Sequence, residues 1–345
     1  MPDSERNILI CGANWLGDSV MSMPAIDFFK ERLPSCRITM LAVEALAELW
    51  DMHSCIDRVI PRKPDTAGML EAIRHVKSAD FNSAFLFPNS TRSALIPFLA
   101  GVKGIRGMRG SYRSWLLDEI APPRLSARYA HQSWEYFDIM GLNGTDFEQR
   151  GGLPRIRPLN PPEEKTEWAR KITQWNNSQP LTALIPGAAR GPSKQWPPEH
   201  FAQLGELIAE HLSSKIVILG SPKEMELCAQ VAGGIKAGTI NLAGETSLTE
   251  LTAVLSLCRT AVTNDSGGMH LASAAGTGVV AVYGLTDPDK TGPLGDACRV
   301  VCGKNVGCSR DIPRRSAEAM ESLRSITPEK VFESVCGLQE EVTGR

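Results

Sequence analysis

Short apolar runs alternate with helical patterns along the whole chain. The predicted strands of the first half are 7–11, 36–43, 58–60 and 83–88. Those of the second half are 181–187, 215–221, 239–244, the run that opens at 260, and 279–284. Strands separated by helices imply parallel pairing through right-handed crossovers. The pattern therefore predicts an α/β protein with two Rossmann-like halves, each built on a doubly wound parallel sheet.

The length of 345 residues fits two domains of about 150 residues each. A proline- and glycine-rich stretch, "GGLPRIRPLNPPEEK", separates the two series of strands and indicates a linker. We expect an N-terminal domain at 1–160, a connecting helix within 161–180 and a C-terminal domain at 181–325. A last helix at 326–345 is expected to pack back towards the N-terminal domain.

Composition and charge narrow the class of protein. The net charge of −2 gives no overall basic field, so nucleic acid is not an expected partner. The four-residue apolar run before Cys11 is too short for a signal peptide, and no run reaches the roughly 18 residues that span a bilayer. Nine cysteines without a secretory signal indicate reduced thiols. Cys302 and Cys308 lack a CxxC pattern or a nearby histidine, so thiols are favoured over a metal site there. We expect a cytosolic protein.

The loop after the first predicted strand, "GANWLGDS" at 12–19, has the glycines of a phosphate loop but carries an acid, Asp18. It lacks the G-x-G-x-x-G of dinucleotide sites and the Lys-[Ser/Thr] of a P-loop, which disfavours an NAD-dependent oxidoreductase. Local chemistry favours a cap: Asp18 or Ser22 would cap the following helix, with Pro24 in its first turn.

Two loops of the second half are suited to an anionic ligand. In "IPGAARGPSKQWP" at 185–197, two glycines allow close approach and Lys194 supplies a cation, which suits a diphosphate; a mobile surface loop is the alternative. In "TNDSGGMHLASAAG" at 263–276, a helix beginning near Gly267 offers free N–H groups to an anion. Ser266 and His270 can reach the same place, although a helix-face histidine is the commoner case. Asp265 would cap the helix or accept hydrogen bonds from sugar hydroxyls.

Four stretches together carry a resemblance: "WLGDSVMSMPAIDFFKERLP", "PGAARGPSKQWP", "LAGETSLTEL" and "TNDSGGMHLASAAGTGVVAVYG". In order and spacing they resemble the ADP-heptose:lipopolysaccharide heptosyltransferases of glycosyltransferase family 9, most closely their heptosyltransferase II branch. The resemblance covers nearly the whole chain. It implies the GT-B architecture, two facing Rossmann-like domains with an interdomain cleft. The N-terminal domain would bind the acceptor and the C-terminal domain the donor.

The resemblance also implies roles for single residues. Asp18 matches the general base and Lys194 the lysine at the donor diphosphate, while Thr246 matches a position near the adenosine. The full set implied at the donor is Lys194, Thr246, Asn264, Asp265, Ser266, Gly267, Gly268 and His270. One departure is the C-terminal stretch, which keeps only Cys302 and Cys308 where family members of this type carry more cysteines.

A mechanism follows from these expectations. Lys194 and the helix at Gly267 would stabilise the leaving diphosphate in place of a metal, so neither a metal nor another cofactor is expected. Asp18 would take the acceptor proton in one inverting displacement.

The expected acceptor is an anionic core glycolipid at the inner face of the inner membrane. Its candidate ligands, in or near the basic stretch 101–128, are Arg62, Lys63, Arg106, Arg109 and Arg113. A solvated basic face is the alternative for each of these residues. A family 9 transferase with another donor or acceptor, and a non-catalytic nucleotide-sugar or glycan-binding protein, are the competing hypotheses.

Overall fold

The computed structural model divides into two compact units, Met1–Asn160 and Pro161–Arg345. It describes residues 6–110, 112–122, 131–142, 154–163, 166–295, 297–304 and 312–343. Cys308 lies outside these residues. The eight described cysteines are free thiols.

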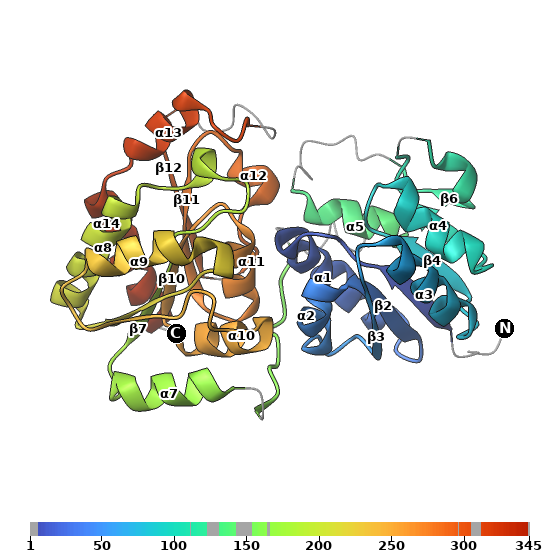
Figure 1. Ribbon diagram of the computed structural model, residues 1–345, viewed down its shortest axis with the longest axis horizontal. Helices are drawn as coiled ribbons and strands as arrows, with labels where there is room; N and C mark the ends of the chain where they lie inside the picture. Colours follow the sequence, from blue (N-terminus) through green and yellow to red (C-terminus); the bar gives the residue numbers. More distant parts are fainter. Residues whose placement is uncertain are drawn as a thin grey trace. The chain divides into compact units, whose positions relative to one another are not determined.

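The first unit is a six-stranded parallel sheet with the order β3-β2-β1-β4-β5-β6 (Figure 1). Its strands are β1 (Asn7–Cys11), β2 (Arg37–Val43), β3 (Arg58–Arg62), β4 (Ser83–Leu86), β5 (Ile105–Gly107) and β6 (Glu119–Ile120). Its helices and 3₁₀ turns are α1 (Leu16–Arg32), η1 (Glu44–Leu46), α2 (Ala47–Asp51), α3 (Thr66–Lys77), α4 (Thr91–Leu99), η2 (Ser114–Leu116) and α5 (Ser133–Ile139).

The second unit repeats this topology, with six parallel strands in the order β12-β11-β10-β7-β8-β9. Its strands are β7 (Leu181–Ile185), β8 (Lys215–Ile218), β9 (Thr239–Asn241), β10 (Thr260–Asn264), β11 (Gly278–Tyr283) and β12 (Cys298–Cys302). Its larger helices are α7 (Glu167–Asn176), α8 (Pro198–Leu212), α9 (Met225–Gly233), α10 (Leu248–Leu257), α11 (Gly267–Ala274), α13 (Ala317–Arg324) and α14 (Pro328–Thr343). Its short elements are η5 (Pro192–Lys194), η6 (Pro222–Glu224) and α12 (Pro288–Thr291). The predicted parallel α/β architecture is confirmed.

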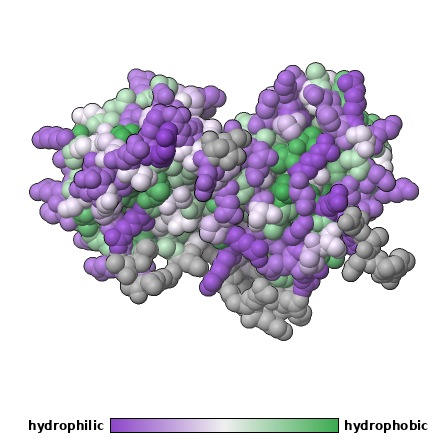
Figure 2. Space-filling model, turned by 90° about the horizontal axis from the view of Figure 1, so that it is seen from below, coloured by the Kyte–Doolittle hydropathy of each residue, from purple (hydrophilic) through white to green (hydrophobic). Residues whose placement is uncertain are grey.

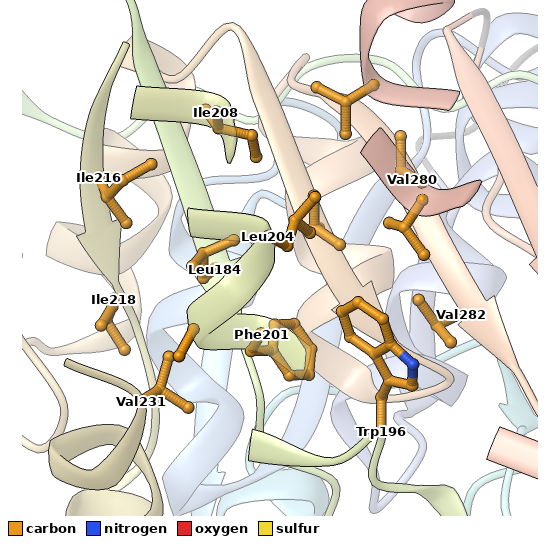
Figure 3. Packing of buried hydrophobic residues seen from close by; sticks show 14 of the residues in the cluster. Leu184, Trp196, Phe201, Leu204, Ile208, Ile216, Ile218, Val231, Val280 and Val282 are labelled. Carbon is orange, nitrogen blue, oxygen red and sulfur yellow. The ribbon is translucent and has the colours of Figure 1, made fainter. Parts of the chain in front are cut away.

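The strands read as continuous apolar runs because helices cover both faces of each sheet. In the first unit, Leu9 and Cys11 of β1 contribute to a cluster with buried residues of α3 and α4. The corresponding cluster of the second unit includes Trp196, which lies near Phe201 and Val282, together with Leu184 and Val280 (Figure 3). The strands are uniformly apolar because both faces of each sheet are buried, and these apolar side chains hold each sheet in place.

The prediction for the C-terminal helix is wrong. Helix α14 packs against α8 and lies along β10, β11 and β12 of its own unit. Val331, Val335 and Leu338 are buried in the cluster around Trp196. The connecting helix α7 also belongs to the second unit, because it packs against α10 and its Trp168 Nε1 donates to the Glu245 carbonyl at 3.0 Å.

The start of α1 also differs from the prediction. The helix begins at Leu16, with Trp15 as an extended N-cap that makes no side-chain cap bond. Asp18 is therefore the third helical residue and not a cap, and Pro24 lies in the helix interior and not in its first turn. All residues of α1 from Ser19 to Phe29 are buried, so the helix is packed on every side. Tertiary packing, and not local capping chemistry, therefore decides where it starts.

The polar surface is broken only by limited apolar areas in the view of Figure 2. Among the described helices, none combines the length and the apolar character needed to cross a bilayer.

A buried polar triad joins α1 to the loop after α2. The Cys55 thiol donates to Asp27 Oδ1 at 3.2 Å, and His53 Nε2 lies 3.6 Å from the same oxygen. His53 Nδ1 accepts the Cys55 N–H at 3.3 Å, which assigns the ring proton to Nε2. These three residues could hold a metal ion by residue type. The Cys55 thiol and the Cys55 N–H instead bond Asp27 and His53, so the group is a structural triad.

This triad predicts a pH dependence of stability. Burial lowers the pKa of His53 below 6.5, an effect that the neighbouring Asp27 carboxylate only partly opposes. On acidification through about 6.5 the unfolded chain binds a proton that the folded protein does not, so the free energy of unfolding falls. We expect His53→Gln to flatten this loss, by at most about 1.4 kcal/mol per pH unit.

Urea unfolding at pH 7.5, 6.5 and 5.5 measures the slope. His75→Gln is the matched control, since this histidine is about half exposed. Equal slopes for wild type and His53→Gln would contradict the prediction.

Candidate functional site

Each sheet reverses its strand order at one point, between β1 and β4 in the first unit and between β7 and β10 in the second. In open α/β sheets, ligands bind beyond the carboxyl ends of the strands at such a switch point. Asp18 lies in the first turn of α1, directly after the loop that follows β1; the segment carrying Lys194 follows β7, and the Asp265 loop follows β10. All three loops singled out in the sequence therefore lie at switch points.

In the second unit, Lys194 and Asp265 form an ion pair between Nζ and Oδ2. The Thr286 hydroxyl donates to the same carboxylate oxygen at 2.8 Å. All three side chains are largely buried, and register pairing of β7 with β10 brings their loops side by side. Asp265 is thus neither a helix cap nor a free acid: it fixes the lysine of the neighbouring loop.

Helix α11 begins directly beside this ion pair. Ser266 is its N-cap in an extended conformation, but the side chain makes no cap bond, and Ser266 Oγ is buried without a hydrogen-bond partner among the described residues. Gly268 is needed for close packing, since a Cβ there would lie 2.9 Å from Ile185 Cγ2. His270 follows one turn into the helix and is buried. The first-turn N–H groups have no acceptor within the helix, so this end can bind an anion.

A buried tyrosine lies on the other side of Asp265. Burial, and then the nearby Asp265 carboxylate, raise the pKa of the Tyr283 phenol well above its ordinary value. The phenol stays protonated and donates to the Thr291 carbonyl at 2.7 Å. The carboxylate of Asp265 is thus flanked by a neutral phenol and paired with Lys194.

Asn264 has a different role from the predicted one. Its side chain is fully buried, with Nδ2 donating to the Pro186 carbonyl at 2.7 Å and Oδ1 accepting the Trp196 N–H at 2.9 Å. These bonds join the end of β10 to both ends of the Lys194 loop. Asn264 therefore positions the site and is removed from the donor-contacting set.

The segment at 313–316 also holds the Lys194 loop, through hydrogen bonds to Ser193. Ser193 Oγ donates to the Pro313 carbonyl at 2.7 Å and accepts the Ser316 N–H at 2.7 Å. Gly191 has a positive φ of 91°, and a Cβ there would lie 2.9 Å from Arg314. The segment after β12 thus shapes the turn that presents Lys194.

Thr246 lies away from this ion pair in sequence and topology. It precedes α10 on the β9 side of the sheet and is partly exposed. The next residue, Ser247, forms a capping box with Glu250 that fixes the start of α10. The backbone position of Thr246 is thus fixed by the start of α10, at a different strand end from that of Lys194.

In the first unit, the Asp18 carboxylate has a defined orientation. Gln132 Nε2 donates to Asp18 Oδ1 at 2.5 Å, from the residue that precedes α5, and lies 3.5 Å from the Tyr136 hydroxyl. Gly12 keeps the loop before α1 close to the sheet, because a Cβ there would lie 2.8 Å from Met40 Sδ. The acid is held at the carboxyl edge of the sheet rather than used to cap the helix.

The predicted basic residues divide into two groups. Arg113 is fully buried, with its guanidinium donating to the carbonyls of Pro88 and Met108, at 2.6 Å each. Arg106 forms an ion pair with Glu119 and donates to the carbonyls of Ile139 and Asp138. Their donors hold the fold, so these two arginines are removed from the acceptor candidates.

The remaining basic candidates are accessible. Arg62 ends β3 and is half-buried; burial and the neighbouring Arg92 guanidinium lower its pKa. Arg92 donates to the Asp65 carbonyl at 2.5 Å, and Lys63 is exposed beside Arg62. Arg109 is also exposed. Two guanidinium groups that repel each other at the carboxyl edge of a sheet indicate a place for an anion.

A family model described as glycosyltransferase family 9 (heptosyltransferase) matches residues 69–320 of this chain. The chain belongs to glycosyltransferase family 9. It is 31% identical to lipooligosaccharide heptosyltransferase 2 of Haemophilus ducreyi, over 95% of this chain and 98% of that protein. It is likewise 31% identical to lipopolysaccharide heptosyltransferase 2 of Escherichia coli K12, over 96% of this chain and 98% of that protein.

Solved structures agree with this family 9 assignment. The structure of the E. coli ADP-heptose lipopolysaccharide heptosyltransferase II matches with a TM-score of 0.81 and 27% identity, over 98% of this chain and 99% of that chain. A family 9 glycosyltransferase from Veillonella parvula matches with a TM-score of 0.84 and 21% identity, over 99% of each chain, which supports the fold. The predicted GT-B fold class is therefore confirmed at the level of two Rossmann-like units.

Sequence reasoning missed four residues of this family 9 site. Gln132 and Arg92 lie at the carboxyl edge of the first sheet but come from segments that carry no motif. Thr286 and Ser193 contribute only through side-chain hydrogen bonds. The one available signal was for Ser193, which adjoins Lys194. The other three are distant in sequence from the residues that they contact.

The hydrogen bond from Thr286 to Asp265 predicts a stability effect. Thr286→Val would leave a buried carboxylate oxygen with Lys194 alone, and loss of a buried hydrogen bond to a charged group costs about 1–3 kcal/mol. We expect the free energy of unfolding to fall by that amount in urea unfolding. Thr286→Ser keeps the hydroxyl and should retain most of the stability. A Val variant as stable as wild type would contradict the contact.

Proposed function

We propose that this family 9 enzyme transfers heptose from ADP-heptose onto a heptose of the lipopolysaccharide inner core, with inversion at the transferred carbon. The observation that carries this proposal is the ion pair of Lys194 and Asp265 beside the start of α11, at the switch point of the second sheet. Similarity to heptosyltransferase 2 proteins over nearly the whole chain supports the choice of sugar and acceptor.

The donor half-site has three groups that can stabilise a leaving diphosphate. Lys194 supplies a cation, the first turn of α11 supplies N–H groups, and Ser266 Oγ is a buried hydroxyl free to bond a phosphate oxygen. Charge that develops on the leaving group in a dry site is stabilised strongly by donors that are already in place. We propose that these groups do the work of a divalent metal, so that the reaction needs none.

Asp265, His270 and Thr246 complete the donor half-site in this proposal. Asp265 holds Lys194 in place before the donor binds, and its second carboxylate oxygen faces the sugar hydroxyls. His270, one turn into α11, lies close to the phosphates. Thr246 contacts the adenosine, at the β9 side of the sheet.

Asp18 is the proposed general base. A carboxylate is ionised at neutral pH and can accept the proton of the attacking hydroxyl. The Gln132 amide bonds one carboxylate oxygen at 2.5 Å and so sets the direction in which Asp18 presents itself. Gln132 is a positioning residue in this scheme, since it acts through Asp18.

The acceptor is proposed to be an anionic glycolipid at the cytoplasmic face of the inner membrane, which makes the enzyme cytoplasmic and peripheral. Arg62, Lys63 and Arg92 would bind its acidic groups, with Arg109 as a further exposed cation. Guanidinium groups suit this task because they bond carboxylate and phosphate in bidentate fashion.

The base assignment predicts a specific kinetic defect. Asp18→Asn keeps the size and the hydrogen bond to residue 132 but cannot accept the proton. We expect turnover of ADP-heptose with a truncated core lipid acceptor to fall by roughly 10²- to 10⁴-fold, with donor affinity unchanged. Product formation is scored by mass and donor affinity by calorimetry. Near-normal turnover would refute the assignment of Asp18.

The donor assignment is tested by thermal protection. A ligand that binds only the folded protein raises its melting temperature, by an amount set by its concentration relative to its Kd. ADP-heptose is expected to raise it and a UDP-hexose is not, and Lys194→Ala should lose most of the rise. Protection by the UDP-sugar would favour a family 9 transferase with another donor. Protection by ADP-heptose without any turnover would favour a binding protein.

A further inference from the structure

Four large apolar side chains of the first unit are exposed in one short stretch. Phe98, Leu99, Tyr112 and Trp115 expose 43%, 52%, 91% and 67% of their surface. Phe98, at the end of α4, contacts Trp115 of η2, with the two rings edge to face and their centroids 5.7 Å apart, and Leu99 and Tyr112 lie close to them in sequence. We name these four residues the aromatic patch. Contiguous exposed apolar side chains on a folded protein mark an interaction site.

The backbone holds the aromatic patch in a fixed shape. Trp115 Nε1 donates to the Tyr112 carbonyl at 3.1 Å, which locks the indole against its own segment. Tyr112 has a positive φ of 55°, a conformation that costs free energy for a bulky residue. A turn closed by the Val102 N–H on the Pro97 carbonyl at 3.0 Å ends α4. Exposed aromatic rings are thus presented by an ordered segment.

The charge around the patch is positive. Lys103 and Arg109 are exposed within the same stretch of chain. Of the two acids that follow in sequence, Glu119 pairs with Arg106, and Asp118 Oδ2 accepts the Ile105 N–H at 2.8 Å. The combination of amphipathic Trp and Tyr with nearby cations suits the headgroup region of an anionic bilayer, where aromatic rings anchor and basic residues gain from the surface potential.

We propose that the aromatic patch inserts into the headgroup region of an anionic bilayer and holds the first unit at the membrane surface. The exposed cations Lys103 and Arg109 in the same stretch favour an anionic lipid surface as the occupant. This inference rests on the proposed function in one respect: the proposed glycolipid acceptor would lie in the same bilayer.

Vesicle flotation tests the proposal with the full chain. Wild type is expected to float with vesicles of phosphatidylcholine and phosphatidylglycerol at 70:30, and far less with phosphatidylcholine alone. The double variant Phe98→Ser with Trp115→Ser should lower the partition coefficient by about tenfold or more, because the apolar area that enters the bilayer sets the affinity. Lys103→Gln should weaken binding at low salt by a smaller factor.

Leu257→Ser is the matched control, an exposed apolar residue of the second unit, and should bind as wild type does. Unchanged thermal unfolding of the double variant shows that it is folded. Equal flotation of wild type and the double variant would overturn the proposal. So would a wild-type oligomer that the double variant converts to a monomer, since the patch would then join two copies of the chain.

An activity assay separates this proposal from the proposed function. With a delipidated, water-soluble core acceptor, the double variant should turn over within about twofold of wild type. With the acceptor embedded in anionic vesicles, its rate should fall by about tenfold, in line with its lower membrane occupancy. Equal rates on embedded acceptor would count against the patch. Absence of turnover by wild type on both acceptors would contradict the proposed function while leaving the flotation result to decide the membrane contact.

Discussion

Parallel pairing of β7 with β10 is the constraint on which the donor half-site depends. It brings the carboxyl ends of two strands together although they are far apart in the chain, and it sets the Lys194 loop beside the start of α11. Asn264, fully buried at the end of β10, then bonds both ends of that loop. A cation, a buried hydroxyl and a helix N-terminus converge because one strand pair fixes all three.

The first unit has the same architecture but carries different residues at its switch point. Its sheet has the same strand order, but the helix that follows β1 carries Asp18 in its first turn, and Arg62 ends β3 near Arg92. In the proposed scheme, the first unit presents a base and exposed cations, and the second unit a phosphate site. Two units of the same topology would then take different parts in one group transfer, because the residues that follow their strands differ.

Polar residues that line these loops also do structural work. The Arg113 guanidinium donates to backbone carbonyls, and Arg106 pairs with Glu119. One carboxylate oxygen of Asp265 binds both Lys194 and Thr286. Buried polar groups must be bonded, so a charged residue near a switch point is often held by the fold before it meets a ligand. The basic stretch of the first unit shows the difference: two of its arginines are internal, while Lys103 and Arg109 remain at the surface beside the aromatic patch.

Strand burial and loop chemistry are local patterns, so the residue order alone was enough to predict two α/β units and to single out the segments that follow β1, β7 and β10. It could not determine that α14 joins the second core, that α1 begins at Leu16, or that Gln132 bonds Asp18. It also could not separate the buried Arg113 from the exposed Arg109. Each of these depends on which distant segments pack together, and that is set by the tertiary structure, since a side chain's partners and its exposure are properties of the packed fold and not of its neighbours in the chain.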